Sequence, residues 1–446
     1  MFISQLGKEL NTSGLGIDLG TINISAIFFA DDICLIARNK NTLNKLMDIT
    51  RIFFKTHKLA LSETKSKVMN YNSQTGKTTF QGNHLSTLTL ESVLNFKYLG
   101  VQMSCSPYNM FKAFNDQVRE KSRAYLSSVL SLVKTGPDQA SLAHTLWTLC
   151  AVPAILYGSE VMPLTQGTID EVERCQNIVG KFMLQIPRSS ANVSCNLDAG
   201  LKPIWAVLAE KVLLYANKLM AKPHSYWARI ALTDQITLGS KSPFVRYLLK
   251  WKTVTKSFGV DPKQIRKNVN FTAISGILDE QGRTCATTFA MNGPESSTHR
   301  WFKPKTWVND SCSSKIIAEF RACNTGLGNR GPAKDGNFYK LCPLCAKTGT
   351  TALNNEVYKQ RILFLYPILL YFQVHMLFDC CSMSQYRDSS DLKPFIETYR
   401  RANPAISSLK LYSLYLNDKH PQDMKRKAVD LYQMQLGWKS LMGISN

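Results

Sequence analysis

Two short apolar runs, separated by an acidic pair, form the clearest pattern in the first part of the chain. Residues 27–30 and 33–37 are short and rich in β-branched and aromatic side chains, which predicts two strands. Asp31 and Asp32 then lie on a tight connection between these strands. Neighbouring carboxylates flanked by buried strands repel each other unless a cation offsets the repulsion. An ordinary surface turn remains the alternative from these residues alone.

Helical periodicity follows in two separate stretches. Residues 42–57 carry a broad apolar stripe, formed by Leu43, Leu46, Met47, Ile49, Phe53 and Phe54. From 107 to 222 the pattern is mainly helical and favours a packed bundle. One helix there is predicted to begin at Thr168, with Glu171 completing a capping box, and to stop at Pro187.

Beyond residue 223 the periodicity weakens. A loop is predicted from a cluster of small residues and a proline: Gly239, Ser240, Ser242 and Pro243. The apolar run at 362–372 is 11 residues long, whereas a membrane-spanning helix needs about 20, and Pro367 interrupts it. A membrane span is therefore not expected. The first ten residues do not resemble a signal peptide, so reduced thiols and a nuclear or cytoplasmic location are expected.

The net charge of the chain indicates the kind of partner it binds. The 446 residues include 54 Lys and Arg against 32 Asp and Glu, a net charge of +22. Such an excess favours a polyanion, because each cation that neutralises a phosphate releases a counterion. Residues 226–341 hold 18 basic and 8 acidic residues. Aromatic residues on which bases can stack are interleaved there, unless they belong to the core: Phe244, Tyr247, Trp251, Phe258, Trp301 and Trp307.

The segment Phe29-Ala30-Asp31-Asp32 resembles the FADD box of the reverse-transcriptase palm in LINE-type (non-LTR) retrotransposons. Further landmarks follow in the family's order. Residues 61–69 are similar to the family's Asn-x-x-Lys-Thr-x-Val-Met stretch, although serines at 62 and 66 replace the usual Asn and Thr. Tyr98, Leu99 and Gly100 resemble the YLG element near the primer, and residues 156–160 resemble the Tyr-Gly-x-Glu step of the thumb.

This resemblance implies an RNA-directed DNA polymerase of the α+β class, with a small antiparallel palm sheet and helix followed by a helical thumb. Its partners would be RNA and DNA as a template–primer duplex, including the element's own RNA, and Mg²⁺ would assist nucleotidyl transfer. Asp31 would be a metal ligand and Asp32 would orient the site or bind more weakly. Lys65 would donate a proton to pyrophosphate, or be a surface lysine. Thumb contacts to phosphates are expected from Lys121, Arg123, Lys181 and Arg188.

The resemblance implies a site with two metal ions, and such a site also needs an aspartate from an earlier palm strand. Only Glu9 and Asp18 are acidic before the predicted hairpin, and the fingers are missing. We therefore expect a truncated enzyme, or a sequence that gives only part of the enzyme, with no polymerase activity alone. Two alternatives stay open: an enzyme completed by a separate fingers–palm fragment, and a domesticated nucleic-acid-binding protein without catalysis.

Four residues near the C-terminus have the composition of a zinc site. Cys342 and Cys345 form a C-x₂-C step, and His375 and Cys380 complete a tetrahedral donor set for structural Zn²⁺. The set resembles the CCHC knuckle of LINE proteins, with Cys381 as an alternative ligand and an accidental cluster as the competing interpretation. The 29 residues between Cys345 and His375 exceed a compact knuckle, so residues 358–374 are interpreted as a retained intron or a late insertion.

Together these patterns predict five segments. They are a partial palm (1–105), a helical thumb (106–225), a basic connector (226–330), an interrupted zinc knuckle (331–385) and a helical tail (386–446). In the tail, Lys425, Arg426 and Lys427 form either a nuclear-import or phosphate-binding patch or an ordinary solvated helix face. The sequence does not determine the oligomeric state.

Overall fold

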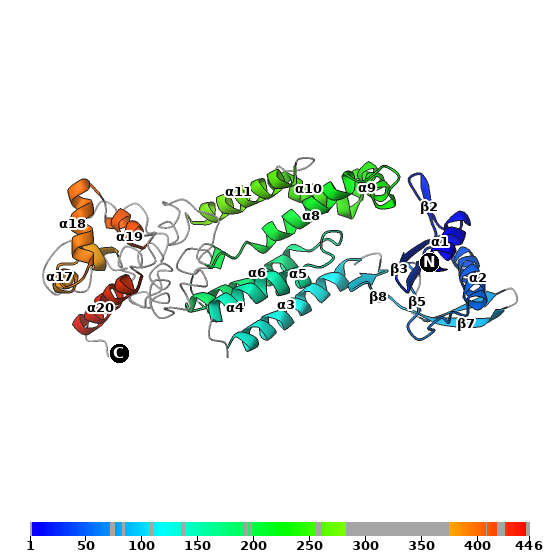
Figure 1. Cartoon of the computed structure of the whole chain (residues 1–446), viewed down its shortest axis with the longest axis horizontal. Coiled ribbons are helices and arrows are strands. Elements are labelled where there is room, and N and C mark those ends of the chain that lie inside the picture. The colour runs from blue at the N-terminus through cyan, green and yellow to red at the C-terminus, as the bar shows by residue number, and fades with distance from the viewer. Residues whose placement is uncertain are drawn as a thin grey trace, which may run out of the picture. The chain divides into compact units, whose positions relative to one another are not determined.

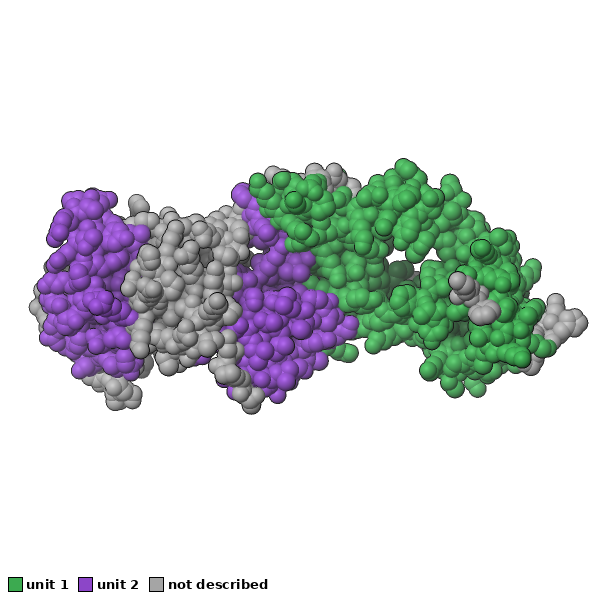
Figure 2. Space-filling model, viewed as in Figure 1, with its two compact units in different colours: residues 1–120, 156–168, 208–268 green, residues 121–155, 169–207, 269–446 purple. Residues whose placement is uncertain are grey.

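The computed structural model describes residues 2–71, 76–82, 85–106, 110–134, 139–188, 190, 192, 195–196, 199–255, 261–281, 374–406, 408–416 and 424–442. Small sheets occupy the N-terminal part and helices follow them (Figure 1). The predicted α+β class is therefore confirmed. Two compact units are coloured in Figure 2: residues 1–120, 156–168 and 208–268 form the first, and residues 121–155, 169–207 and 269–446 form the second.

Two apolar clusters in the first unit sit on either side of one helix. Helix α2 (Lys40–Thr56) packs Leu46 and Phe53 against Leu6 and Leu10 of α1 (Phe2–Thr12), and all four are buried. Its Met47 packs instead with residues of the three-stranded sheet of β5 (Lys67–Val68), β6 (Gly76–Gly82) and β7 (Leu85–Ser92). The helix predicted over 42–57 is confirmed.

The start of α2 is set by a capping box. The Thr42 backbone N–H donates to Asn39 Oδ1 at 3.0 Å, and the Asn39 N–H donates to Thr42 Oγ1 at 3.3 Å. These bonds satisfy N–H groups that have no partner inside the helix. The helix therefore begins two residues before the predicted position.

Helix α6 (Gln166–Leu184) also begins earlier than predicted. The Thr168 N–H donates to Thr165 Oγ1 at 3.3 Å, so Thr165 caps the helix, and the prediction that Thr168 caps it is wrong. The apolar positions of this helix were placed correctly, since Ile169, Val172, Val179 and Met183 are buried. The other helices before residue 221 are α3 (Lys112–Val133), α4 (Gln139–Thr145), the π-helix η1 (Leu146–Ala151), α5 (Val152–Ile155) and α8 (Ile204–Met220).

Regular helices continue where the sequence pattern weakens. They are α9 (Trp227–Leu238), α10 (Pro243–Thr255) and α11 (Pro262–Gln281), and the predicted loop between the first two is the 3₁₀ turn η2 (Gly239–Lys241). In α10, Val245, Leu248 and Trp251 recur every third residue and are buried, which gives this helix a core-facing side. The segment predicted as a basic connector (226–330) therefore contains three regular helices as far as residue 281.

The described C-terminal residues are helical, as expected. After η4 (His375–Asp379) and η5 (Cys381–Met383) come α17 (Ser384–Asp388), α18 (Leu392–Ala402), α19 (Ser408–Leu416) and α20 (Met424–Met442). Neither interpretation of the basic cluster on α20 fits all of its members. Lys427 is only 8% exposed and its Nζ lies 5.3 Å from the centre of the Tyr415 ring, while Arg426 pairs with Asp391.

No helix within the described ranges is long and apolar enough to cross a membrane. The apolar run at 362–372 lies outside those ranges.

Candidate functional site around the carboxylate hairpin

The acidic pair lies at the tip of a two-strand hairpin. Strand β3 (Ala26–Phe29) pairs antiparallel with β4 (Asp32–Leu35), and Phe29 faces Asp32 in the last pair before the turn. Ala30 and Asp31 form a two-residue turn, in which Ala30 has a φ of +52°. A positive φ at the first turn position matches the right-handed twist of the strands. The predicted tight connection is confirmed.

Both carboxylates are exposed to solvent. Asp31, Asp32 and the adjacent Phe29 are exposed, and the strands below them are mostly half-buried. Water therefore screens the repulsion between the two charges. The two carboxylates are thus open to a ligand from solution.

A second hairpin carries the Tyr-Leu-Gly element. Strands β8 (Asn95–Tyr98) and β9 (Val101–Ser104) pair antiparallel, and Leu99 and Gly100 connect them with φ values of +47° and +82°. Positive φ at both positions is typical of a type I′ turn. Gln117 of α3 holds this turn, because its side chain donates to Gly100 O at 2.9 Å and accepts from the Gln102 N–H at 3.0 Å.

Tyr98, the last residue of β8, has a half-buried side chain. Burial raises the pKa of the Tyr98 hydroxyl, and the negative charges of Cys34 and Asp32 raise this pKa further. Tyr98 therefore lies within electrostatic reach of the acidic pair. Its Oη is buried and makes no hydrogen bond to any described residue.

The element at 156–160 packs against the Tyr98–Gly100 turn. A Cβ on Gly100 would lie 3.4 Å from the Tyr157 ring, and a Cβ on Gly158 would lie 2.8 Å from Val101 Cγ2. Gly158 has a φ of +87°, which glycine adopts without strain. These two motifs, far apart in the sequence, form one packed structure in which both glycines allow close approach.

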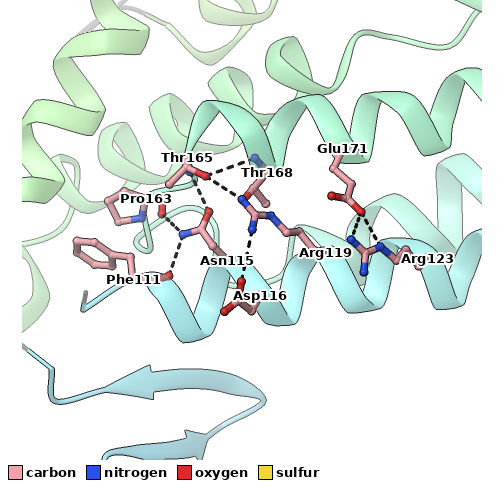
Figure 3. Close-up of polar contacts among 9 residues, drawn as sticks. All are labelled: Phe111, Asn115, Asp116, Arg119, Arg123, Pro163, Thr165, Thr168 and Glu171. Carbon is pink, nitrogen blue, oxygen red and sulfur yellow. Dashed lines mark hydrogen bonds and ion pairs between the residues drawn. The ribbon is translucent and has the colours of Figure 1, made fainter. Parts of the chain in front are cut away.

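Asn115 fastens this region, and sequence reasoning did not identify it. The buried side chain donates from Nδ2 to Phe111 O at 2.8 Å and to Pro163 O at 3.1 Å (Figure 3). Its Oδ1 accepts from the Thr165 N–H at 2.9 Å. One side chain on α3 therefore fixes the chain that enters α6. Nothing in the local sequence distinguishes Asn115 from an exposed helix residue, because its partners are distant.

The predicted thumb cations divide into two kinds. Lys121 and Lys181 are half-buried and donate to backbone carbonyls, those of Ala154 at 3.4 Å and Arg188 at 2.8 Å respectively. Burial lowers the pKa of Lys181. The Arg123 side chain is 65% exposed and pairs with Glu171 at 2.6 Å, as drawn in Figure 3, and Arg188 is exposed. The two arginines thus present more charge to solvent than the two lysines.

Other candidate residues are not gathered at the hairpin tip. Lys65 is exposed on the turn at 63–65, and within the described residues it forms no salt bridge with Asp31 or Asp32. Asp18 accepts from Asn23 Nδ2 at 2.7 Å and pairs with Arg38. Within the ranges that the structure describes, no group of three or more His, Cys, Asp or Glu side chains could hold a metal ion.

The residues predicted for zinc and for base stacking are placed only in part. Cys342 and Cys345 lie outside the described residues, His375 begins η4, and Cys380 is buried. Among the aromatic residues, Tyr247 and Trp251 are 5% and 2% exposed, so they belong to the core and not to a stacking surface. Burial also raises the pKa of Tyr247. Phe244 is half-buried, and Phe258, Trp301 and Trp307 lie outside the described ranges.

Comparison with known families gives one match. Residues 1–103 match the family described as "Reverse transcriptase (RNA-dependent DNA polymerase)". The matched segment contains the carboxylate hairpin, Lys65 and the Tyr98–Gly100 turn, and it supports a reverse transcriptase. A search among curated proteins found no match to the chain.

Proposed function

Starting from a reverse-transcriptase segment at residues 1–103, we propose that the chain is the later part of a non-LTR (LINE-type) retrotransposon enzyme. Its retained activity is the binding of an RNA–DNA template–primer duplex. The observation that carries the proposal is the exposed pair Asp31 and Asp32 at the tip of a tight hairpin. The order of motifs along the sequence supports the LINE-type assignment.

The residues at the tip fit part of a magnesium site. Mg²⁺ takes one or two protein carboxylates together with substrate phosphates, and both carboxylates here are open to solvent. Bound Mg²⁺ supplies charge stabilisation to the reacting phosphates. The backbone of Asp32 is fixed by its pairing with Phe29, whereas Asp31 lies on the turn, so Asp32 holds the more rigid position.

The same site lacks a third carboxylate among the described residues. Asp18 is occupied by Arg38 and Asn23, so it does not complete the donor set. We therefore expect no templated synthesis by this chain alone in a primer-extension assay with Mg²⁺ or Mn²⁺. Templated product that disappears in Asp31→Ala would contradict this expectation; product that persists in Asp31→Ala would indicate a contaminating polymerase.

Duplex binding is tested by the salt dependence of affinity. We expect the affinity for a fluorescein-labelled RNA–DNA duplex to fall steeply with KCl, as counterion release requires. Arg123→Gln and Arg188→Gln should each reduce the slope of log K against log salt by about 1. Asp31→Ala is the matched control, because it changes one exposed charge without removing a phosphate-binding cation. An affinity that does not depend on salt would contradict the proposal.

Two related functions give different results in the same assays. Extension restored by adding a separate fingers–palm fragment would identify an enzyme completed in trans. Salt-dependent binding without any restored extension would favour a domesticated nucleic-acid-binding protein.

We extend the proposal to a zinc site formed by Cys342, Cys345, His375 and Cys380, which is supported by the C-x₂-C and H-x₄-C steps of the sequence. Purified protein should then contain one zinc ion per chain by elemental analysis. Cys342→Ser should lose this ion. Cys150→Ser is the control, because Cys150 is an exposed cysteine outside the set. Equal zinc contents in the two variants would exclude the site.

A further inference from the structure

The turn between α8 and α9 presents two aromatic rings to solvent. Tyr226 and Trp227 are 39% and 46% exposed, and their rings are tilted by 38° with centres 6.4 Å apart. They are neighbours in sequence, and Trp227 is the first residue of α9. Tyr247 and Trp251 are buried, so the turn, and not α10, offers aromatic surface to a partner.

Two basic residues belong to the same turn as these rings. Lys222 Nζ lies 5.8 Å from the centre of the Tyr226 ring, and Arg229 follows two residues after Trp227. Between Glu210 and Asp234 the chain has four basic residues and no acidic residue. An anionic partner would therefore be attracted to this stretch of the chain.

Hydrogen bonds within the turn order its backbone. Arg229 donates from Nη1 to the Lys222 carbonyl, and its Nη2 lies 3.1 Å from His224 Nε2. The Tyr226 N–H donates to Pro223 O at 2.9 Å. A turn ordered in this way loses little conformational freedom when a ligand settles on it.

We propose that this turn, defined by Lys222, Tyr226, Trp227 and Arg229, binds single-stranded nucleic acid. A base stacks on Trp227, and the cations hold the adjoining phosphates, because aromatic rings next to cations bind unpaired bases whatever their sequence. In a duplex the base faces are already stacked, so duplex would not use the rings. The absence of acidic residues in this stretch of the sequence favours a polyanion over a basic protein partner. The inference rests on the proposed nucleic-acid-binding function.

The test compares two exposed aromatic residues in the full chain. Trp227→Ala should weaken affinity for a short fluorescein-labelled oligo(dT) by about tenfold, in the range of one lost stacked base. Phe271→Ala is the matched control, since Phe271 is 71% exposed on α11 and also removes one ring without changing charge. Binding of the RNA–DNA duplex should be equal in both variants and in the unmodified chain. Trp227→Phe should retain most of the oligo(dT) affinity.

Each outcome bears on a different claim. Equal oligo(dT) affinities in Trp227→Ala and Phe271→Ala, with duplex binding intact, would overturn the stacking site and leave the proposed function standing. Failure of the unmodified chain to bind either probe would overturn both. If Trp227→Ala instead changes only the oligomeric state measured by light scattering, the turn is a protein interface and the inference is wrong.

Discussion

Replacement of Gly158 by alanine should disturb the packing between the 156–160 element and the β8–β9 turn. The backbone there has a φ of +87°, which costs an L-residue about 1–2 kcal/mol. The added Cβ would also lie 2.8 Å from Val101 Cγ2 and 3.4 Å from the buried Phe114 ring. Overpacking of this kind costs about 1–3 kcal/mol. Together the two effects predict a loss of about 2–5 kcal/mol of stability.

A double-mutant cycle separates the two effects. Val101→Ala removes the Cγ2 atom that the new Cβ meets, so the combined variant should recover the overpacking part and keep the cost of the positive φ. Gly14→Ala is the matched control: its φ is +65° and an added Cβ meets nothing within 4 Å, so it measures the backbone cost alone. Urea unfolding, with hydrogen exchange of peptides covering 95–104, gives the free energies. The reasoning fails if Gly158→Ala costs no more than Gly14→Ala, or if Val101→Ala leaves its cost unchanged.

Three further predictions concern polar groups. Burial raises the pKa of the Asp430 carboxyl above its ordinary value of 3.8, and this carboxyl accepts a hydrogen bond from Tyr415 Oη at 3.1 Å. Because the folded-state pKa is the higher one, the chain loses stability as pH rises from 3.8 through the folded-state pKa. The melting temperature of Asp430→Asn should therefore change less with pH across this interval than that of the unmodified chain. Asn115→Ala should destabilise the chain by about 1–3 kcal/mol in urea unfolding, because it leaves buried backbone groups without partners. Glu171→Gln removes the ion pair of Arg123 and should raise duplex affinity measured by anisotropy at low salt, because Glu171 no longer competes with phosphate for Arg123; an unchanged affinity would count against Arg123 as a phosphate contact.

The elements that the sequence predicts well are those decided by neighbouring residues. The hairpin at 26–35 follows from two short β-rich runs and a two-residue connection, and α2 follows from its apolar stripe. The start of α6 is different. Thr165 caps this helix while its N–H is bound by Asn115, fifty residues earlier in the chain, and so local spacing pointed to Thr168 instead. Thr165 and Thr168 look equivalent in the sequence, and the hydrogen bond to Asn115 distinguishes them in the structure.

The candidate site shows the same division. Each motif could be located from its residues, but their contacts could not, because Gly100 and Gly158 belong to segments far apart in sequence. A glycine in each motif was the available signal, since glycine often marks close backbone approach. The aromatic residues of α10 were misjudged for a related reason. Tyr247 and Trp251 occur among lysines and arginines, yet their helical spacing directs them into the core.

Solvent exposure of the acidic pair has a consequence for metal binding. Because Asp31 and Asp32 are exposed, water screens the repulsion between their charges. An ion held by two exposed carboxylates must take its remaining ligands from water, from substrate phosphates or from a further carboxylate. Metal affinity at this tip should therefore depend on bound nucleic acid and nucleotide more than on the chain itself. Asp31→Asn should accordingly leave the unfolding of the free chain unchanged with or without Mg²⁺, and a stabilisation by Mg²⁺ that Asp31→Asn abolishes would show that the site is already complete.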